Sequence, residues 1–147
     1  MKKRLLRLCV PLVVATLVAG CGGGDTMDPE PPPAAGPPDL SGTYSLVSLN
    51  QGGFTIGPPL ATGTFTLSQT SSSGDSASGT MTYEVAVPSQ GIMLQDQGTF
   101  TIRTDGTWQQ SGTEVQALGT YTLAGNVLTV IVTEPLAAAS TTIWQRQ

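Results

Sequence analysis

Few side chains in this chain are able to do nucleophilic or metal chemistry. It has no histidine, and its cysteines are Cys9 and Cys21. Without histidine, neither a Ser-His-Asp or Cys-His nucleophile system nor a histidine-based zinc or copper site can be built. Asp96 and Asp105 flank one predicted strand instead of converging on a pocket from different strands, as the carboxylates of a glycosidase do. The sequence therefore predicts a protein that is not an enzyme, with no metal and no cofactor.

Cys21 follows a segment with the pattern of a cleaved signal. A basic start is followed by the apolar run 8–18, which is shorter than the roughly 20 residues that a membrane-spanning helix requires. Residues 1–20 are therefore predicted to be a signal peptide and not a transmembrane helix. The basic residues of its start are Lys2, Lys3, Arg4 and Arg7.

The tetrapeptide Val18-Ala19-Gly20-Cys21 resembles the lipobox of bacterial lipoproteins. The resemblance implies that the thiol of Cys21 becomes a diacylglyceryl thioether, with fatty acyl chains such as palmitate, and that cleavage makes Cys21 the first mature residue. Two or more acyl chains hold a protein at a membrane for long times, so the membrane partner is expected to be bound through the lipid on Cys21. The residue after the cysteine is Gly22 and not Asp, which favours the outer membrane of the cell envelope in a Gram-negative organism.

Two alternatives remain for Cys21. It could be the last residue of an ordinary secretory signal, or it could be a buried structural cysteine. The run Gly22-Gly23-Gly24 that follows offers no side chains to pack around a buried thiol. This run therefore favours the lipid-attachment site.

The mature chain is predicted to be strongly acidic. Loss of the four basic residues in 1–20 changes the net charge from −4 to −8 and leaves Arg103 and Arg146 as the cations. Such a surface repels nucleic acid, which is therefore excluded as a partner. The acids are scattered along the chain, as expected for a solvated surface: Asp25, Asp28, Glu30, Asp39, Asp75, Glu84, Asp96, Asp105, Glu114 and Glu134.

The amino-acid composition and the pattern of apolar residues change between segment 21–38 and segment 39–147. The first segment consists of Gly, Pro, Ala and acidic residues without apolar periodicity, so it is predicted to be a flexible tether that holds the following domain away from the membrane. The second segment has the length of one domain. With both cysteines assigned to the signal and the lipid, this domain has to be stable without a disulfide.

From residue 40 onward, apolar and polar residues alternate with a period of two, which is typical of half-buried antiparallel strands. Glycine turns such as Asp105-Gly106 and Gly125-Asn126 separate these segments, and 71–78 is predicted to be a polar loop. No helix is expected after the signal. The predicted strands cover 41–49, 62–69, 79–87, 97–104, 107–112, 116–123, 126–134 and 140–146.

The predicted fold is all-β: an eight-stranded antiparallel meander closed as a barrel. Closure removes two exposed edges that would otherwise invite aggregation. A two-sheet β-sandwich is the alternative.

The two ends of 39–147 resemble those of bacterial lipocalin-like domains. Residues 40–46 contain Gly42-Thr43-Tyr44, which is similar to the Gly-x-Trp or Gly-x-Tyr opening strand of that family, and residues 141–146 resemble its closing strand with an Arg. The resemblance implies a barrel in which Arg146 lies across the ring of Tyr44 at the closed end. A solvated charge at Arg146 is the alternative.

We expect the inward side chains to form the core and to line any cavity that remains, which would favour a small hydrophobic ligand. The loops 50–61 and 88–95 carry apolar residues and are expected to fold over the end of the barrel. The predicted function is a lipid-anchored, non-catalytic envelope protein that binds such a ligand; the alternative is a structural or protein-interaction module with a filled barrel, for which the sequence names no partner. The candidate pocket residues are Phe65, Leu67, Met81, Tyr83, Phe100, Ile102, Trp108 and Tyr121.

Overall fold

The computed structural model describes residues 35–147 of the chain. The predicted signal peptide, Cys21 and the tether up to residue 34 lie outside the described residues. Within 35–147, the chain already packs before the predicted domain boundary at residue 39, because Pro37 is buried and a Cβ added at Gly36 would lie 3.2 Å from the carbonyl oxygen of Gly74. No helix in the described part of the chain has the length and apolarity required to cross a membrane.

The described chain consists of strands joined by short connections, with two single turns of 3-10 helix. The turns are η1 (Pro88–Gln90) and η2 (Leu136–Ala138). The strands are β1 (Gly42–Gln51), β2 (Phe54–Ile56), β3 (Thr62–Ser73), β4 (Ser76–Val87), β5 (Ile92–Arg103), β6 (Thr107–Gly112), β7 (Gln116–Ala124), β8 (Val127–Glu134) and β9 (Ser140–Arg146).

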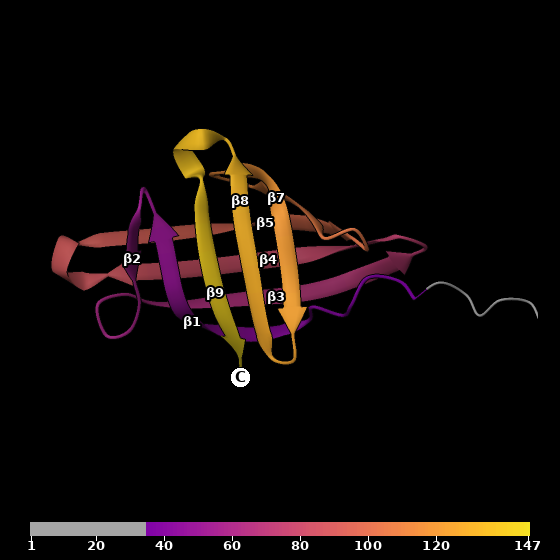
Figure 1. Ribbon diagram of the computed structural model, residues 1–147, viewed down its shortest axis with the longest axis horizontal. Coiled ribbons are helices and arrows are strands. Elements are labelled where there is room, and N and C mark those ends of the chain that lie inside the picture. Colours follow the sequence, from indigo (N-terminus) through magenta and orange to yellow (C-terminus); the bar gives the residue numbers. More distant parts are fainter. Residues whose placement is uncertain (1–34) are drawn as a thin grey trace, which may run out of the picture. The chain divides into compact units, whose positions relative to one another are not determined.

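The predicted closed barrel is confirmed. All strand pairs are antiparallel, the sheet order is β2-β1-β3-β4-β5-β6-β7-β8-β9, and β1 also pairs with β9. Eight strands therefore close on themselves while the short β2 is added beside β1. In Figure 1, β1, β9, β8 and β7 run across the longer β3, β4 and β5. The two-sheet sandwich is excluded because no sheet edge separates β9 from β1.

The predicted loop over residues 71–78 is shorter than the sequence suggested. Residues 71–78 were expected to form a loop, but β3 and β4 continue to Ser73 and Ser76 and turn at Gly74, which has a φ of 54°. The serines of this hairpin are polar because it extends into solvent, and the hydroxyls of Ser71 and Ser78 lie 2.8 Å apart across the pair. Polarity here therefore marked an exposed strand and not a loop. The predicted turn at Asp105-Gly106 is present, and Gly106 has a φ of 86°.

The connections divide the barrel into two ends. The end that contains the β3–β4, β5–β6 and β7–β8 turns, together with residues 35–41, is called the closed end. The opposite end, called the open end, contains β2 and the β4–β5, β6–β7 and β8–β9 connections. All strand pairs and the apolar core lie within residues 40–146. Residues 35–147 therefore form a self-contained folding unit.

Candidate functional site

A cavity of about 270 Å³ lies inside the barrel and reaches the open end. Its wall is mainly apolar, with polar atoms from Gln51, Gln110, Ser140 and Thr142. Concave, mainly apolar sites with a few polar groups are typical of small-molecule binding. The apolar and aromatic lining residues are Leu49, Phe65, Tyr83, Val85, Leu94, Trp108, Val115, Ala117, Val130, Val132, Ala137 and Ala138.

The predicted pocket residues divide into two groups. Phe65, Tyr83 and Trp108 line the cavity. The others are buried in the packed core of the barrel, as expected for inward side chains where no cavity remains: Leu67, Met81, Phe100, Ile102 and Tyr121. Period-two alternation identifies the side chains that point inward, but it does not reveal how far along the barrel the packed core extends.

The aromatic side chains form one connected group at the inner part of the cavity. The rings of Trp108 and Phe100 are stacked, with centroids 5.4 Å apart and an interplanar angle of 5°. Phe65 meets Tyr83 and Trp108 edge to face at 6.2 and 6.1 Å, and Trp144 at 5.2 Å. Offset and edge-to-face pairs of this kind contribute about 0.5–1.5 kcal/mol each beyond their buried area, so these rings are held in fixed positions.

Trp108 brings an unpartnered donor to this site. Its side chain is fully buried, and its indole Nε1–H has no hydrogen-bond acceptor among residues 35–147. An unsatisfied buried donor costs about 1–3 kcal/mol, and such groups in native structures call for an explanation. Trp144 has the same unpartnered Nε1–H, but it is not part of the cavity wall.

The apolar loops do not cover the open end as expected. Phe54 is 79% exposed and Met93 is 60% exposed, whereas Ile56 packs against the core. The part of the chain that reaches the cavity from the β8–β9 connection is Ala137 and Ala138 of η2. Because alanine side chains are short, this cover leaves the cavity partly unfilled.

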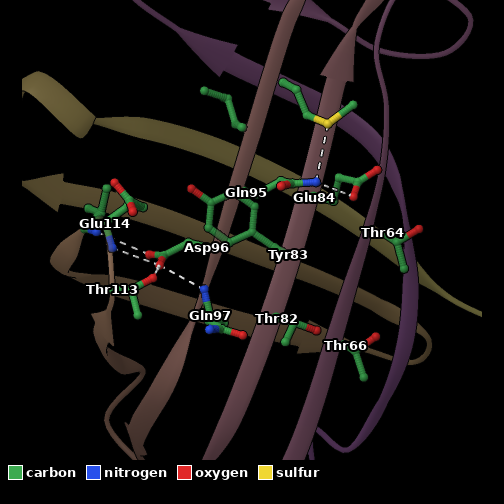
Figure 2. A pocket seen from close by; sticks show the side chains of 13 residues that line it. Thr64, Thr66, Thr82, Tyr83, Glu84, Gln95, Asp96, Gln97, Thr113 and Glu114 are labelled. Carbon is green, nitrogen blue, oxygen red and sulfur yellow. Dashed lines mark hydrogen bonds between the residues drawn. The ribbon is translucent and has the colours of Figure 1, made fainter.

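A second, open hollow of about 940 Å³ lies along β3, β4, β5 and the β6–β7 turn (Figure 2). Tyr83 and Leu94 line both this hollow and the barrel cavity. The hollow is mainly polar. Its Glu84 carboxylate accepts a hydrogen bond from Gln95 Nε2 at 2.7 Å.

Asp96 is the buried charge between the two hollows. Its side chain is 5% exposed, and in Figure 2 it points towards Thr113 and Glu114. Oδ1 accepts hydrogen bonds from the backbone N–H of Gln97 and Glu114 and from the hydroxyl of Thr113, at 2.8–3.0 Å. Oδ2 accepts from Val115 N–H at 3.3 Å and Gln110 Nε2 at 3.4 Å. The carboxylate thereby fastens the β6–β7 turn to β5.

These bonds also control the charge of Asp96. Burial by itself raises the pKa of this carboxyl, but the hydrogen bonds that favour its charged form outweigh burial, so the pKa lies below the usual aspartate value. All of its partners are neutral groups. The negative charge of Asp96 therefore lies one side chain away from the cavity wall, and its hydrogen-bond partners in the described part of the chain include no cation.

Asp96 can occupy this position because residue 112 is a glycine. A Cβ added at Gly112 would overlap the Asp96 carboxylate. The sequence interpretation treated Asp96 as one of several solvated acids, and this was wrong. Gly112-Thr113-Glu114 was the available signal: a glycine followed by a turn with a hydroxyl and free N–H groups that a carboxylate could accept from.

The sequence-predicted pair Tyr44 and Arg146 lies together at the closed end, away from the cavity. The guanidinium carbon of Arg146 is 5.2 Å from the centroid of the Tyr44 ring, and its Nε and Nη2 donate to the Tyr44 hydroxyl at 3.1 and 2.7 Å. The hydroxyl donates in turn to the carbonyl of Leu40 at 2.8 Å, and Arg146 also donates to the carbonyl of Asp39. Both ends of the described chain are thus fastened at this position.

The remaining acids form no metal centre in the described part: residues 35–147 contain no group of three or more metal-ligating side chains close enough to hold an ion. What the arrangement offers is a shaped apolar cavity with a few hydrogen-bonding groups. Comparison of the chain with protein-family models, with curated proteins and with solved structures found no match.

Proposed function

We propose that this protein is a lipid-anchored component of a bacterial cell envelope whose barrel binds one small apolar molecule through its open end. The anchor rests on the lipobox-like sequence that ends at Cys21. The binding function rests on the cavity inside the barrel.

The observation that carries the binding function is Trp108, a residue of the mainly apolar cavity wall whose buried indole N–H has no acceptor among the described residues. A ligand with one hydrogen-bond acceptor, such as a carbonyl or ether oxygen, would satisfy this donor and fill the space beside the aromatic rings. The volume of about 270 Å³ lies just below the range of ligand sites, which is roughly 300–1,000 Å³. The proposed ligand is therefore small.

Binding is tested on residues 35–147 with 6-propionyl-2-(dimethylamino)naphthalene, an uncharged apolar ketone whose fluorescence reports its surroundings. We expect it to bind with blue-shifted emission. Trp108→Phe should weaken binding by roughly 5- to 10-fold, the value of about one hydrogen bond. The matched control is Trp144→Phe, which removes the other unpartnered indole N–H and should leave the affinity unchanged. Absence of binding by the native barrel, or equal weakening by both variants, would overturn the assignment.

The anchor is tested separately on the full chain in a bacterial host by metabolic labelling with palmitate. Cys21→Ala should abolish labelling and move the protein out of the detergent phase, whereas Cys9→Ala should leave both unchanged. Labelling that persists in Cys21→Ala would rule out the anchor.

A second candidate function is a protein-interaction module of the envelope. It is favoured by the exposed apolar side chains at the open end, Phe54, Leu60, Met93 and Leu136, since apolar patches on a soluble surface often mark contact sites. Crosslinking in intact cells that captures one reproducible partner, lost in Phe54→Ser, would support this role. It would replace the first role if the cavity bound no probe.

A further inference from the structure

We propose that the cavity selects its ligand by charge: it accepts uncharged or cationic apolar molecules and rejects carboxylates and other anions. This inference depends on the proposed ligand-binding function and specifies its substrate class. It follows from the position of Asp96 and from the distribution of charged residues between the two ends of the barrel.

Asp96 is linked to the cavity wall through one side chain. Gln110, which lines the cavity and is itself 8% exposed, donates from Nε2 to Asp96 Oδ2 at 3.4 Å. With its Nε2 directed to Asp96, Gln110 is oriented by the carboxylate. The hydrogen bonds to Asp96 come from neutral groups, so they stabilise the negative charge without cancelling it.

The negative charge of Asp96 also acts on Tyr83, a second residue of the cavity wall. Tyr83 pairs with Asp96 across β4 and β5 and lines the cavity. Burial raises the pKa of the Tyr83 phenol, and the negative charge of Asp96 raises it further. Because the charge of Asp96 disfavours the anionic form of Tyr83, it should also disfavour an anionic ligand bound against the same part of the wall.

The other charged residues near the open end are also acidic. Glu84, Glu114 and Glu134 lie near the ends of β4, β6 and β8 there, and all three are exposed. The arginines of residues 35–147 are at the opposite end: Arg103 is the last residue of β5, before the turn to β6, and Arg146 is held by Tyr44. An anion at the open end therefore meets like charges and no cation.

An anion inside the cavity would be poorly solvated as well. Within the described part of the chain, the polar residues that line the cavity are all neutral. Burial of an ionised carboxylate without a paired cation costs far more than burial of a neutral ester of the same shape. A cationic group of a ligand at the open end would instead be attracted by Glu84, Glu114 and Glu134. This attraction extends over about 30 Å at 0.01 M salt and about 3 Å at 1 M.

The test uses ligands that share one apolar chain and differ in charge. Methyl octanoate, octanoate and octyltrimethylammonium compete with the naphthyl ketone for residues 35–147 at neutral pH and about 0.01 M salt. We expect octanoate to compete at least roughly ten-fold less well than methyl octanoate, and octyltrimethylammonium to compete at least as well as the ester. At about 1 M salt the advantage of the ammonium compound should disappear.

Charge variants locate the effect. The gap is the difference in competition strength between octanoate and methyl octanoate. The double variant Glu114→Gln and Glu134→Gln changes exposed residues and should narrow this gap. Asp96→Asn should narrow it more, provided that circular dichroism shows the variant to be folded. Asp75→Asn, the same charge change in the β3–β4 turn of the closed end, is the matched control and should leave the gap unchanged.

Two failures are distinguishable. If the ketone and the ester bind but octanoate competes equally well, charge selection is refuted while ligand binding stands. The double variant removes two negative charges and Asp75→Asn removes one. If Asp75→Asn narrowed the gap half as much as the double variant or more, charge selection would also be refuted, since overall charge and not the open end would then be responsible. If neither the ketone nor the ester binds, the proposed function fails and the charge selection fails with it.

Discussion

The closed and open ends of the barrel are formed by the same strands but completed in different ways. At the closed end, Leu40 and Tyr44 are fully buried, and Arg146 joins the two ends of the described chain through the Tyr44 hydroxyl. At the open end the core gives way to a cavity, and large apolar side chains such as Phe54 remain in solvent. The comparison shows that one end of the barrel is closely packed while the other leaves a cavity, which the proposed ligand-binding function requires.

Each end also contains one buried or half-buried charge with the opposite sign. The cation Arg146 is satisfied by a phenol hydroxyl and a backbone carbonyl, and it fastens β9 to the chain before β1. The anion Asp96 is satisfied by N–H and hydroxyl donors, and it fastens the β6–β7 turn. In both cases a charge organises irregular backbone, because hydrogen bonds to ionised groups are stronger than neutral ones.

The largest expected effect tests the packing of the closed end. Tyr44→Ala removes a fully buried ring and leaves Arg146 without its acceptor, so the free energy of unfolding should fall by about 3–5 kcal/mol. Tyr44→Phe keeps the ring and loses the hydrogen bonds, with an expected loss of about 1–2 kcal/mol. Urea unfolding followed by tryptophan fluorescence measures both. A loss below about 1 kcal/mol for Tyr44→Ala would mean that the closed end does not dominate stability.

A matched pair of enlargements compares the two ends directly. Ala77 lies in the packed core near the β3–β4 turn, and Ala117 lines the cavity; both are buried. Ala77→Leu should destabilise the barrel by about 1–3 kcal/mol through overpacking, whereas Ala117→Leu should change stability by less than about 0.5 kcal/mol and displace the naphthyl ketone. Thermal unfolding and probe titration give both values. Equal destabilisation by the two substitutions would show that the cavity has no room for a side chain.

The smallest expected effect is on the stability of the barrel at low pH. Because the folded-state pKa of Asp96 lies below its unfolded value, its contribution to stability is present above the unfolded pKa of about 3.9 and is lost as pH falls through the folded pKa. Asp96→Asn should therefore unfold with a weaker dependence on pH below about 4 than the native barrel. Urea unfolding at a series of pH values measures this. Asp39, whose pKa is lowered by hydrogen bonds from Ser41, keeps part of the dependence in both proteins. Identical pH profiles would show that Asp96 carries no stabilising charge.

Much of the fold follows from local pattern. Alternation with a period of two predicted the strands, and Asp105-Gly106 predicted a tight turn, because only a few residue types adopt its backbone angles. Loss of exposed edges favoured the closed barrel, and the β1–β9 pairing confirms it. The contact between Tyr44 and Arg146 was expected from the resemblance of the chain's two ends to lipocalin-like domains, not from any local pattern.

The lengths of the hairpins and the cover of the open end did not follow from the sequence. Serines between residues 71 and 78 suggested a loop, yet their backbone groups pair as strands beyond the barrel wall. Phe54 and Met93 suggested a plug, yet they point into solvent. Composition therefore did not distinguish an exposed strand from a loop, or an apolar side chain in solvent from one that plugs the barrel.

The sequence by itself determined most of the side chains that turn inward and several of the turns, because these depend on periodicity and turn chemistry within a few residues. It favoured a barrel over a sandwich, but closure itself is the pairing of β1 with β9, which lie at opposite ends of the domain. Only the tertiary structure decided where the inward side chains fill the barrel and where they leave a cavity, since that depends on how side chains from strands far apart in the chain meet. It also decided that Asp96 is a buried charge. Its donors at residues 113–115 lie 17–19 positions away and reach the carboxylate only when β5 and the β6–β7 turn pack together around Gly112.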